Sequence, residues 1–431
     1  MNYKEMYQRK VVSVEEALKE IKSGQEVLCG MVACEPVAML SQLHTIKDRV
    51  EDVSVVTALL MNEYDFFMNP EMKGHFLMNN WFYTAGARKA HAHGTVSYVP
   101  LELHRFMSNR TAHRQPDVFL GCACPMDKQG FLSLSMCTVH EKDLVEQAGK
   151  VIIEVNPHFP RTYGDSHIHI SDIDYIIETD RAIPVHPKSS INDKERTIGE
   201  YVADLIEDES TLQIGFGSIP LAVAGCLTGK KDLGVHTEMF SECLLDLYEA
   251  GALTNRKKTI WKDKFVADVA LGTQRLYDFL DNNMAVEFQR GSVVNDPRII
   301  GRNHKMVSIN SALQIDLTGQ CCAESIGSRQ YSGTGGHKEF IQGVQYSPGG
   351  KSIIAFQSTA RNDSISHIMP RLEAGTMVTT SRVDLDYVVT EYGIASLRGR
   401  SIRERVKELI SIAHPDFRDY LRSEAERNQI W

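Results

Sequence analysis

The sequence lacks three features that would indicate other classes of protein. Its longest largely apolar stretch, Val53–Met61, has about nine residues, whereas a membrane-spanning helix needs about 20. It has no apolar signal core near the N-terminus, so we expect a cytoplasmic rather than a secreted protein. It has no basic tract and a formal net charge of −9, which gives nucleic-acid binding little electrostatic support. We therefore expect neither a membrane nor a nucleic acid as a partner.

The cysteines and histidines also lack the spacing of known metal sites. Nine cysteines are present, an odd number, and no two of them have Cys-x-x-Cys spacing. Most lie in apolar, strand-like runs, which predicts reduced and buried thiols. The pairs His91/His93 and His167/His169 can each share one face of a strand, but no Cys, Asp or Glu constellation accompanies them. We predict no metal site.

What the sequence does contain is an alternation of short apolar runs and helix-like segments. Val27–Val32, Val53–Leu60 and Val151–Val155 are nearly continuous runs of this kind. Such runs between helices predict an α/β fold with mostly parallel sheets covered on both faces. The chain has 431 residues, of which 42% are hydrophobic and 24% charged. This is an ordinary globular composition, with room for two or three domains of about 100–200 residues.

The chain also repeats itself. A strand, a glycine and a helix opened by proline occur at Val27–Pro36 and again at Leu212–Pro220. The strand that follows aligns as residues 52–58 in the first half and 232–238 in the second. The repeat predicts two related open α/β domains, joined through a proline- and serine-containing linker. The expected domains are residues 1–185 and 186–431.

The repeat isolates one position. Where the first half has Ala58, the second half has Glu238. A carboxylate at the end of a buried strand is unfavourable unless it is hydrogen-bonded or exposed in a cleft. Functional residues of open α/β sheets lie at the carboxyl ends of strands. Glu238 is therefore a candidate functional residue, and the alternative is that it caps a helix starting near Met239.

Two glycine-rich loops accompany this carboxylate. The loop Gly215–Pro220 joins a strand to a helix, where small residues let backbone N–H groups approach a ligand. It is not a dinucleotide-binding fingerprint, because Pro220 replaces the third glycine. The loop Ser332–Gly336 has three glycines in four residues. Two such loops and one unusual carboxylate predict an acyl-transfer site, with a carboxylate nucleophile and backbone donors for an oxyanion.

Several motifs, spread along nearly the whole chain, carry a family resemblance. They are Glu154–Asn156, Tyr163–Asp165, Leu212–Pro220, His236–Met239, Asp246–Gly251, Gly272–Phe279, Ser332–Gly336, Asp386–Ala395 and Ala413–Arg418. Together they resemble the family I CoA-transferases of the acetyl-CoA hydrolase/transferase group. Within that group the sequence is most similar to the 4-hydroxybutyrate CoA-transferases, and the butyryl-CoA:acetate CoA-transferases are near relatives. The resemblance implies two related α/β domains, an active site in the cleft between them and a homodimer.

The resemblance also implies roles for single residues. Glu238 aligns with the nucleophilic glutamate of the family, and Asn310 and Glu391 match polar positions near the reacting centre. The residues implied to meet coenzyme A or an oxyanion are Gly215, Phe216, Gly217, Ser218, Ile219, Leu313, Gly335 and Gly336. Thr237 and the pair Lys338–Glu339 depart from the usual residues of the family, which bears on acyl specificity more than on the reaction class.

The reaction implied is transfer of CoA between a short-chain acyl-CoA and a small carboxylate such as acetate. The acyl-CoA would be 4-hydroxybutyryl-CoA or butyryl-CoA, and the sequence leaves the choice open. Glu238 would form an acyl anhydride and then a glutamyl-CoA thioester, with ping-pong kinetics. The CoA thioester is a substrate, and we expect no permanently bound cofactor. Glu238 should be ionised at pH 7 and therefore not deeply desolvated.

Two other functions remain as alternatives. A short-chain acyl-CoA hydrolase, such as an acetyl-CoA hydrolase, would use the same glutamate and let water attack the thioester. A ligand-binding module would keep the fold without catalysis, although Glu238 and both glycine loops argue against it. His236, two residues before Glu238, either tunes the carboxylate or is a structural hydrogen-bonding residue.

Overall fold

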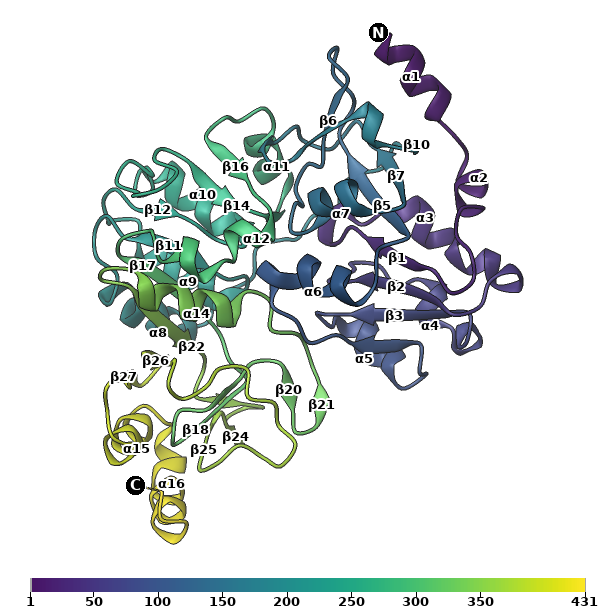
Figure 1. The fold of residues 1–431 in the computed structure, drawn as a ribbon. Helices are drawn as coiled ribbons and strands as arrows, with labels where there is room; N and C mark the ends of the chain where they lie inside the picture. The colour runs from purple at the N-terminus through teal and green to yellow at the C-terminus, as the bar shows by residue number, and fades with distance from the viewer. Residues whose placement is uncertain (1, 431) are drawn as a thin grey trace. The chain divides into compact units, whose positions relative to one another are not determined.

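The computed structural model describes residues 2–430, which form two compact units (Figure 1). Of the described residues, unit 1 comprises 2–187 and 266–294, and unit 2 comprises 188–265 and 295–430. The chain first passes from unit 1 to unit 2 after residue 187, within the expected linker. Residues 266–294, which we expected in the second domain, instead pack in unit 1.

Two sets of contacts explain this return to unit 1. The Arg290 guanidinium forms ion pairs with Asp143, Glu146 and Asp165. The backbone N–H of Thr138 donates to the carbonyl of Asp268 at 2.7 Å. These partners are more than a hundred residues apart in the sequence, so local pattern could not predict them.

Unit 1 is built on a seven-stranded sheet of order β10-β7-β5-β1-β2-β3-β4. Every neighbouring pair is parallel. Its strands are β1 (Glu26–Cys29), β2 (Val53–Thr57), β3 (Phe76–Asn80), β4 (Val96–Tyr98), β5 (Val118–Ala123), β7 (Lys150–Val155) and β10 (Tyr175–Glu178). The α-helices are α1 (Tyr3–Lys10), α2 (Val14–Leu18), α3 (Val37–Gln42), α4 (Asp65–Met68), α5 (Ala85–His91), α6 (Phe106–His113), α7 (Glu141–Gln147), α11 (Gln274–Leu280) and α12 (Gly291–Val294).

Unit 2 is built on a six-stranded sheet of order β12-β11-β17-β22-β26-β27. Its strands are β11 (Thr211–Ile214), β12 (Gly234–Val235), β17 (Met306–Asn310), β22 (Lys351–Ala355), β26 (Tyr387–Thr390) and β27 (Gly393–Ser396). All pairs are parallel except the last, β26 with β27. The α-helices are α8 (Asp193–Asp204), α9 (Ser218–Cys226), α10 (Glu242–Glu249), α13 (Pro297–Ile300), α14 (His337–Tyr346), α15 (Ile402–Ser411) and α16 (Pro415–Arg427).

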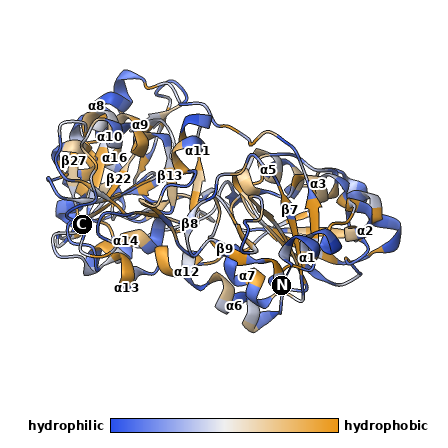
Figure 2. Cartoon of the chain, turned by 90° about the horizontal axis from the view of Figure 1, so that it is seen from above, coloured by the Kyte–Doolittle hydropathy of each residue, from blue (hydrophilic) through white to orange (hydrophobic). Residues whose placement is uncertain are grey.

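Shorter strands complete both units. They are β6 (Phe131–Ser133), β8 (Tyr163–Gly164), β9 (His167–His169), β13 (Met239–Ser241), β14 (Phe265–Ala267), β15 (Val269–Leu271), β16 (Val286–Phe288), β18 (Gln314–Asp316), β19 (Cys321–Cys322), β20 (Ser325–Ile326), β21 (Arg329–Gln330), β23 (Thr359–Ala360), β24 (Ile365–Ser366) and β25 (Ile368–Met369). Figure 2 shows hydrophobic colour on inner strands such as β7, and hydrophilic colour on peripheral helices such as α1. This burial of apolar strands under polar helices is what the sequence pattern predicted.

The predicted repeat is confirmed by the register of the two sheets. Val27 of β1 lies opposite Val55 of β2 in unit 1. Leu212 of β11 lies opposite Val235 of β12 in unit 2. These are the partners that the sequence alignment of the two halves requires. Glu238 therefore occupies the position that Ala58 occupies in unit 1.

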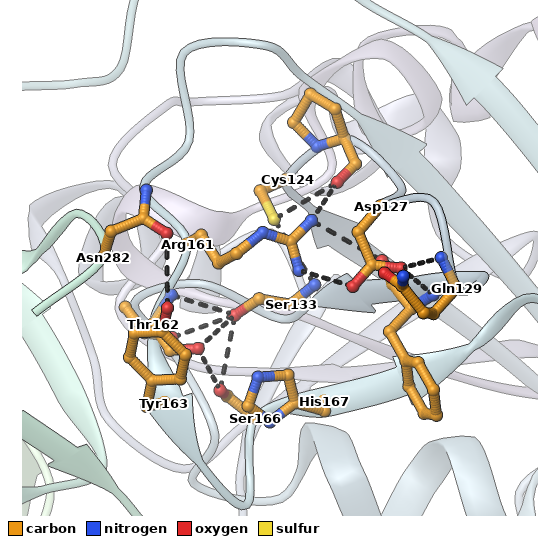
Figure 3. A network of polar contacts seen from close by, with 12 residues as sticks. Cys124, Asp127, Gln129, Ser133, Arg161, Thr162, Tyr163, Ser166, His167 and Asn282 are labelled. Carbon is orange, nitrogen blue, oxygen red and sulfur yellow. Dashed lines mark hydrogen bonds and ion pairs between the residues drawn. The ribbon is translucent and has the colours of Figure 1, made fainter. Parts of the chain in front are cut away.

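A polar network lies beside the antiparallel pair of strands β6 and β9 in unit 1 (Figure 3). The Thr162 hydroxyl donates to the Ser135 carbonyl at 2.7 Å, and its backbone N–H donates to the Ser133 hydroxyl at 3.2 Å. Arg161 forms an ion pair with Asp127 at 3.9 Å. The buried hydroxyl of Ser133 also contacts those of Thr162, at 3.0 Å, and Ser166, at 3.3 Å, so these polar groups have a structural role.

The cysteines are mostly buried, and the histidines of the pair His167/His169 hydrogen-bond to neighbouring groups. All nine cysteines are free, and all except the half-buried Cys226 are buried, as predicted. His169 contacts the Ser171 hydroxyl at 2.7 Å, and His167 contacts the Gly164 carbonyl at 3.2 Å. Within residues 2–430, no group of three or more His, Cys, Asp or Glu side chains is arranged to hold a metal ion. No helix in the same range is long and apolar enough to cross a membrane.

Candidate active site

The parallel sheet of unit 2 brings the predicted residues of that unit to one edge. The residues that follow β11, β17, β22 and β26 all emerge at the carboxyl edge of the sheet, because those strands are parallel. Gly215–Ile219 follow β11, Asn310 ends β17, and Glu391 follows β26. Glu238 comes three residues after β12, which pairs in parallel with β11. This edge is therefore the candidate active site.

Glu238 is half-buried and held by two donors. Its Oε2 accepts a hydrogen bond from Asn295 Nδ2 at 3.2 Å, and its carboxylate also accepts one from the backbone N–H of Gly336. Gly336 is the N-cap of α14, a helix of ten residues. The carboxylate therefore lies where the positive end of the helix dipole favours an anion.

Glycine at position 336 lets the backbone approach Glu238 and Asn295 closely. A Cβ atom there would lie 2.2 Å from Glu238 Oε2 and 2.4 Å from Asn295 Nδ2. Both distances are far below ordinary van der Waals contact. The third glycine of the Ser332–Gly336 loop is thus explained by its close approach to the carboxylate, and not by a positive φ angle, because its φ is −81°.

The surroundings raise the pKa of Glu238 to about 7. Burial is the largest cause, and the nearby Glu339 carboxylate is the next. The hydrogen bonds from Asn295 and Gly336 act in the opposite direction. We expected Glu238 to be ionised at pH 7 and not deeply desolvated. Its burial instead raises its pKa from the ordinary 4.5 to about 7, so the carboxylate is harder to ionise than that of an ordinary glutamate.

The conformation of the first glycine loop depends on one glycine. Gly217 is the N-cap of α9 and has φ +125°, which disfavours any other residue. Phe216 beside it is 45% exposed. The Ser218 hydroxyl donates to Glu195 Oε1 at 2.5 Å, and Glu195 also closes the capping box at the start of α8. The loop is thus fixed while the ring of Phe216 is accessible.

Asn310 belongs to a polar cluster at the ends of β11 and β17. Its Nδ2 donates to Gln213 Oε1 at 3.1 Å and to the Ser308 hydroxyl at 2.8 Å. The Ser308 hydroxyl also donates to Gln213 Oε1, at 2.8 Å. Within the part of the chain that the structure describes, Asn310 makes no hydrogen bond to Glu238.

Glu391 and Leu313 have other partners along the same edge. The Glu391 carboxylate accepts from the backbone N–H and the hydroxyl of Ser358, both at 2.8 Å, and lies 3.7 Å from Lys194 Nζ. The backbone N–H of Leu313 donates to the Cys322 carbonyl at 2.8 Å. A ligand contact at Leu313 would have to use a different backbone group.

The sequence analysis did not identify the two side chains that most affect the Glu238 carboxylate, Asn295 and Glu339. Asn295 belongs to no motif, and Glu339 stood out only as a departure from the family pattern. Asn295 Nδ2 also lies 3.4 Å from Glu339 Oε2, so one amide serves both carboxylates. His236, by contrast, packs against the rings of Trp261 and Phe340, with centroids 5.9 and 6.2 Å away, which favours its structural role.

Comparison with known proteins places this site in a family. Residues 1–187 match the acetyl-CoA hydrolase/transferase N-terminal domain, and residues 272–425 match the C-terminal domain. The chain belongs to the acetyl-CoA hydrolase/transferase family. The resemblance inferred from the motifs is thereby confirmed.

Individual relatives cover the whole chain. The 4-hydroxybutyrate coenzyme A transferase of Clostridium kluyveri is 42% identical, over 99% of this chain and 100% of that protein. The butyryl-CoA:acetate CoA-transferase of Anaerostipes caccae is 34% identical, over 100% and 99%. The crystal structure of RipA from Yersinia pestis superposes with a TM-score of 0.94 at 35% identity, covering both chains fully. An acetyl-CoA hydrolase of Neurospora crassa is more distant, at 27% identity over 78% of this chain and 70% of that protein.

Proposed function

We propose that this protein is a CoA-transferase that moves CoA between 4-hydroxybutyryl-CoA or butyryl-CoA and a carboxylate such as acetate. The observation that carries the proposal is the Glu238 carboxylate, which is held by Asn295 and Gly336 at a helix N-terminus. The full-length identity of 42% to a transferase, against 27% to a hydrolase, supports transfer over hydrolysis.

The proposed reaction starts with attack by a Glu238 oxygen on the thioester carbonyl of the acyl-CoA. A C–O bond forms, the C–S bond breaks, and the electron pair leaves on the CoA sulfur. The thiolate then attacks the Glu238 carbonyl carbon, so that a C–S bond forms and the acyl carboxylate leaves. An acceptor carboxylate reverses these steps, which gives ping-pong kinetics through a glutamyl-CoA thioester.

The contacts of Glu238 Oε2 suit the attack of the thiolate. In that step the Glu238 oxygen that does not carry the acyl group becomes the oxyanion. Oε2 already faces Asn295 Nδ2 at 3.2 Å and lies against Gly336. Donors placed where charge develops stabilise the transition state, and losing one costs on the order of 10²–10³ in rate. We therefore assign Oε2 to the oxyanion and Oε1 to the attack.

The remaining predicted residues keep their proposed roles along the same edge. Coenzyme A would contact the two glycine loops and the segment after β17, through Gly215, Phe216, Gly217, Ser218, Ile219, Leu313, Gly335 and Gly336. Asn310 and Glu391 would lie near the reacting centre. No permanently bound cofactor is part of the proposal, and the homodimer and the cytoplasmic location stay predictions.

Trapping the thioester tests the proposal. The protein is incubated with butyryl-CoA or 4-hydroxybutyryl-CoA without an acceptor and then treated with borohydride. The mass of the peptide containing Glu238 is then measured by mass spectrometry. We expect reduction of Glu238 to an alcohol in the wild type and none in Glu238→Gln. An unmodified Glu238 in the wild type contradicts the covalent mechanism.

A second measurement separates transfer from hydrolysis. A transferase releases CoA over many turnovers only when a second carboxylate is present. We expect acetate to accelerate steady CoA release strongly. Sustained release without any added carboxylate would instead favour the hydrolase.

A further inference from the structure

Glu339 is a buried carboxylate in the first turn of α14. It is hydrogen-bonded to the same amide, that of Asn295, as Glu238. It is only 1% exposed. Its Oε2 lies 3.4 Å from Asn295 Nδ2, whose distance to Glu238 Oε2 is 3.2 Å. An amide nitrogen has two N–H groups, and a carboxylate can only accept. Asn295 therefore donates one N–H to each carboxylate, which fixes the orientation of the amide between them.

The two carboxylates differ in what happens to them during the proposed reaction. Glu238 loses its charge when it becomes an anhydride and then a thioester. Glu339 forms no covalent bond in these steps, and it lies in the first turn of α14. A fixed negative charge close to Glu238 raises the free energy of the free carboxylate but not that of the neutral acylated forms.

Other titratable groups do not supply this charge. Titratable residues close in sequence to Glu238, Asn295 or Gly336 include His236, Glu242, Asp296, His337 and Lys338. Burial lowers the pKa of His337 to about 4, so its ring is neutral at pH 7. Asp296 is paired with Arg298 at 2.7 Å. Glu339 is the charged group that acts on the Glu238 carboxyl.

We propose that Glu339 is a positioning residue, which anchors the Asn295 amide and whose charge favours the covalent states of Glu238 over the free carboxylate. The inference rests on the proposed function and deepens it. When Glu238 becomes acylated, the repulsion between the Glu238 and Glu339 carboxylates is removed. Glu339 itself touches neither substrate nor the bond that breaks.

The test compares Glu339→Gln with Glu339→Asp. Glutamine keeps the size and a hydrogen-bonding oxygen but removes the charge, whereas aspartate keeps the charge. In the wild type, kcat/KM should fall as the pH drops below about 7, because the free carboxylate is protonated there. In Glu339→Gln this acid limb should move to lower pH by about one pH unit. In Glu339→Asp it should stay close to that of the wild type.

The amount of trapped thioester is the second readout. With acyl-CoA and no acceptor, at pH 8, we expect Glu339→Gln to hold a several-fold smaller fraction of Glu238 as thioester than the wild type. Asp419→Asn, which removes an acidic side chain 96% exposed on α16, is the matched control for net charge and should change neither readout. Thermal unfolding of each variant checks that it is folded.

The outcomes separate the two proposals. Absence of the thioester in the wild type overturns the proposed function itself. A wild-type thioester together with an unshifted acid limb and an unchanged trapped fraction in a folded Glu339→Gln overturns the role of Glu339 alone. A shift in Glu339→Gln that Glu339→Asp does not share supports it.

Discussion

Replacing Gly336 with alanine tests the geometry around Glu238 directly. The new Cβ would lie 2.2 Å from Glu238 Oε2 and 2.4 Å from Asn295 Nδ2, whereas ordinary contact begins at 3.4 Å. The same Cβ would also lie 3.2 Å from Cδ2 of Phe340, a side chain of α14 itself. The carboxylate must therefore retreat by roughly 1 Å, a displacement that can lower a rate by about 100-fold.

That loss corresponds to about 2.7 kcal/mol of transition-state stabilisation. Alanine leaves the backbone N–H in place, and the N-cap already lacks a capping side chain, so we expect the protein to stay folded. The effect should appear in kcat for CoA transfer and in the yield of borohydride-reduced Glu238.

The control is Gly225→Ala on α9. A Cβ at position 225 meets no atom within 4 Å, and alanine is the better helix former by about 0.5–1 kcal/mol. Gly225→Ala should keep the activity, and its melting temperature should be equal to or slightly above that of the wild type. A folded Gly336→Ala with wild-type kcat and normal thioester yield would refute the arrangement of Glu238, Asn295 and Gly336.

Three further perturbations follow from the same structure. Glu238→Gln should raise the melting temperature at pH 8 but not at pH 5. The pKa of Glu238 is about 7 in the folded protein, above the ordinary 4.5, so its ionisation destabilises the folded protein as the pH rises, by at most about 3–4 kcal/mol. A gain that is equal at both pH values would contradict this. Glu154→Gln in unit 1 should behave alike, because burial raises its pKa to about 7 and its Oε2 has no hydrogen-bond partner; thermal unfolding at the two pH values checks it. Asn310→Ala should lower kcat/KM by about tenfold or more, since Gln213 Oε1 loses one of its donors at the end of β11; a lower melting temperature with unchanged kinetics would make the cluster purely structural.

The architecture was predictable because its signals are local. Buried parallel strands need continuous apolar runs, and a duplicated unit leaves the same order of strand, glycine and helix in both halves. The strand registers agree with the alignment of the halves, since Val27 lies opposite Val55 and Leu212 lies opposite Val235. Glu238 stood out for the same reason, since a carboxylate replaced Ala58 at a position where burial normally demands an apolar side chain.

The environment of Glu238 was decided only by the tertiary structure. Asn295 is 57 residues from Glu238 and 44 from Glu339 in the sequence, and no periodicity or spacing links positions so far apart. The pKa of Glu238 is raised only because the fold buries its carboxylate and brings Glu339 close to it, since both effects act over short distances. The return of residues 266–294 to unit 1 has the same origin: Arg290 finds its carboxylates only after the chain has folded. A sequence can thus identify the reactive group, while its ionisation and orientation arise from contacts that only the fold creates.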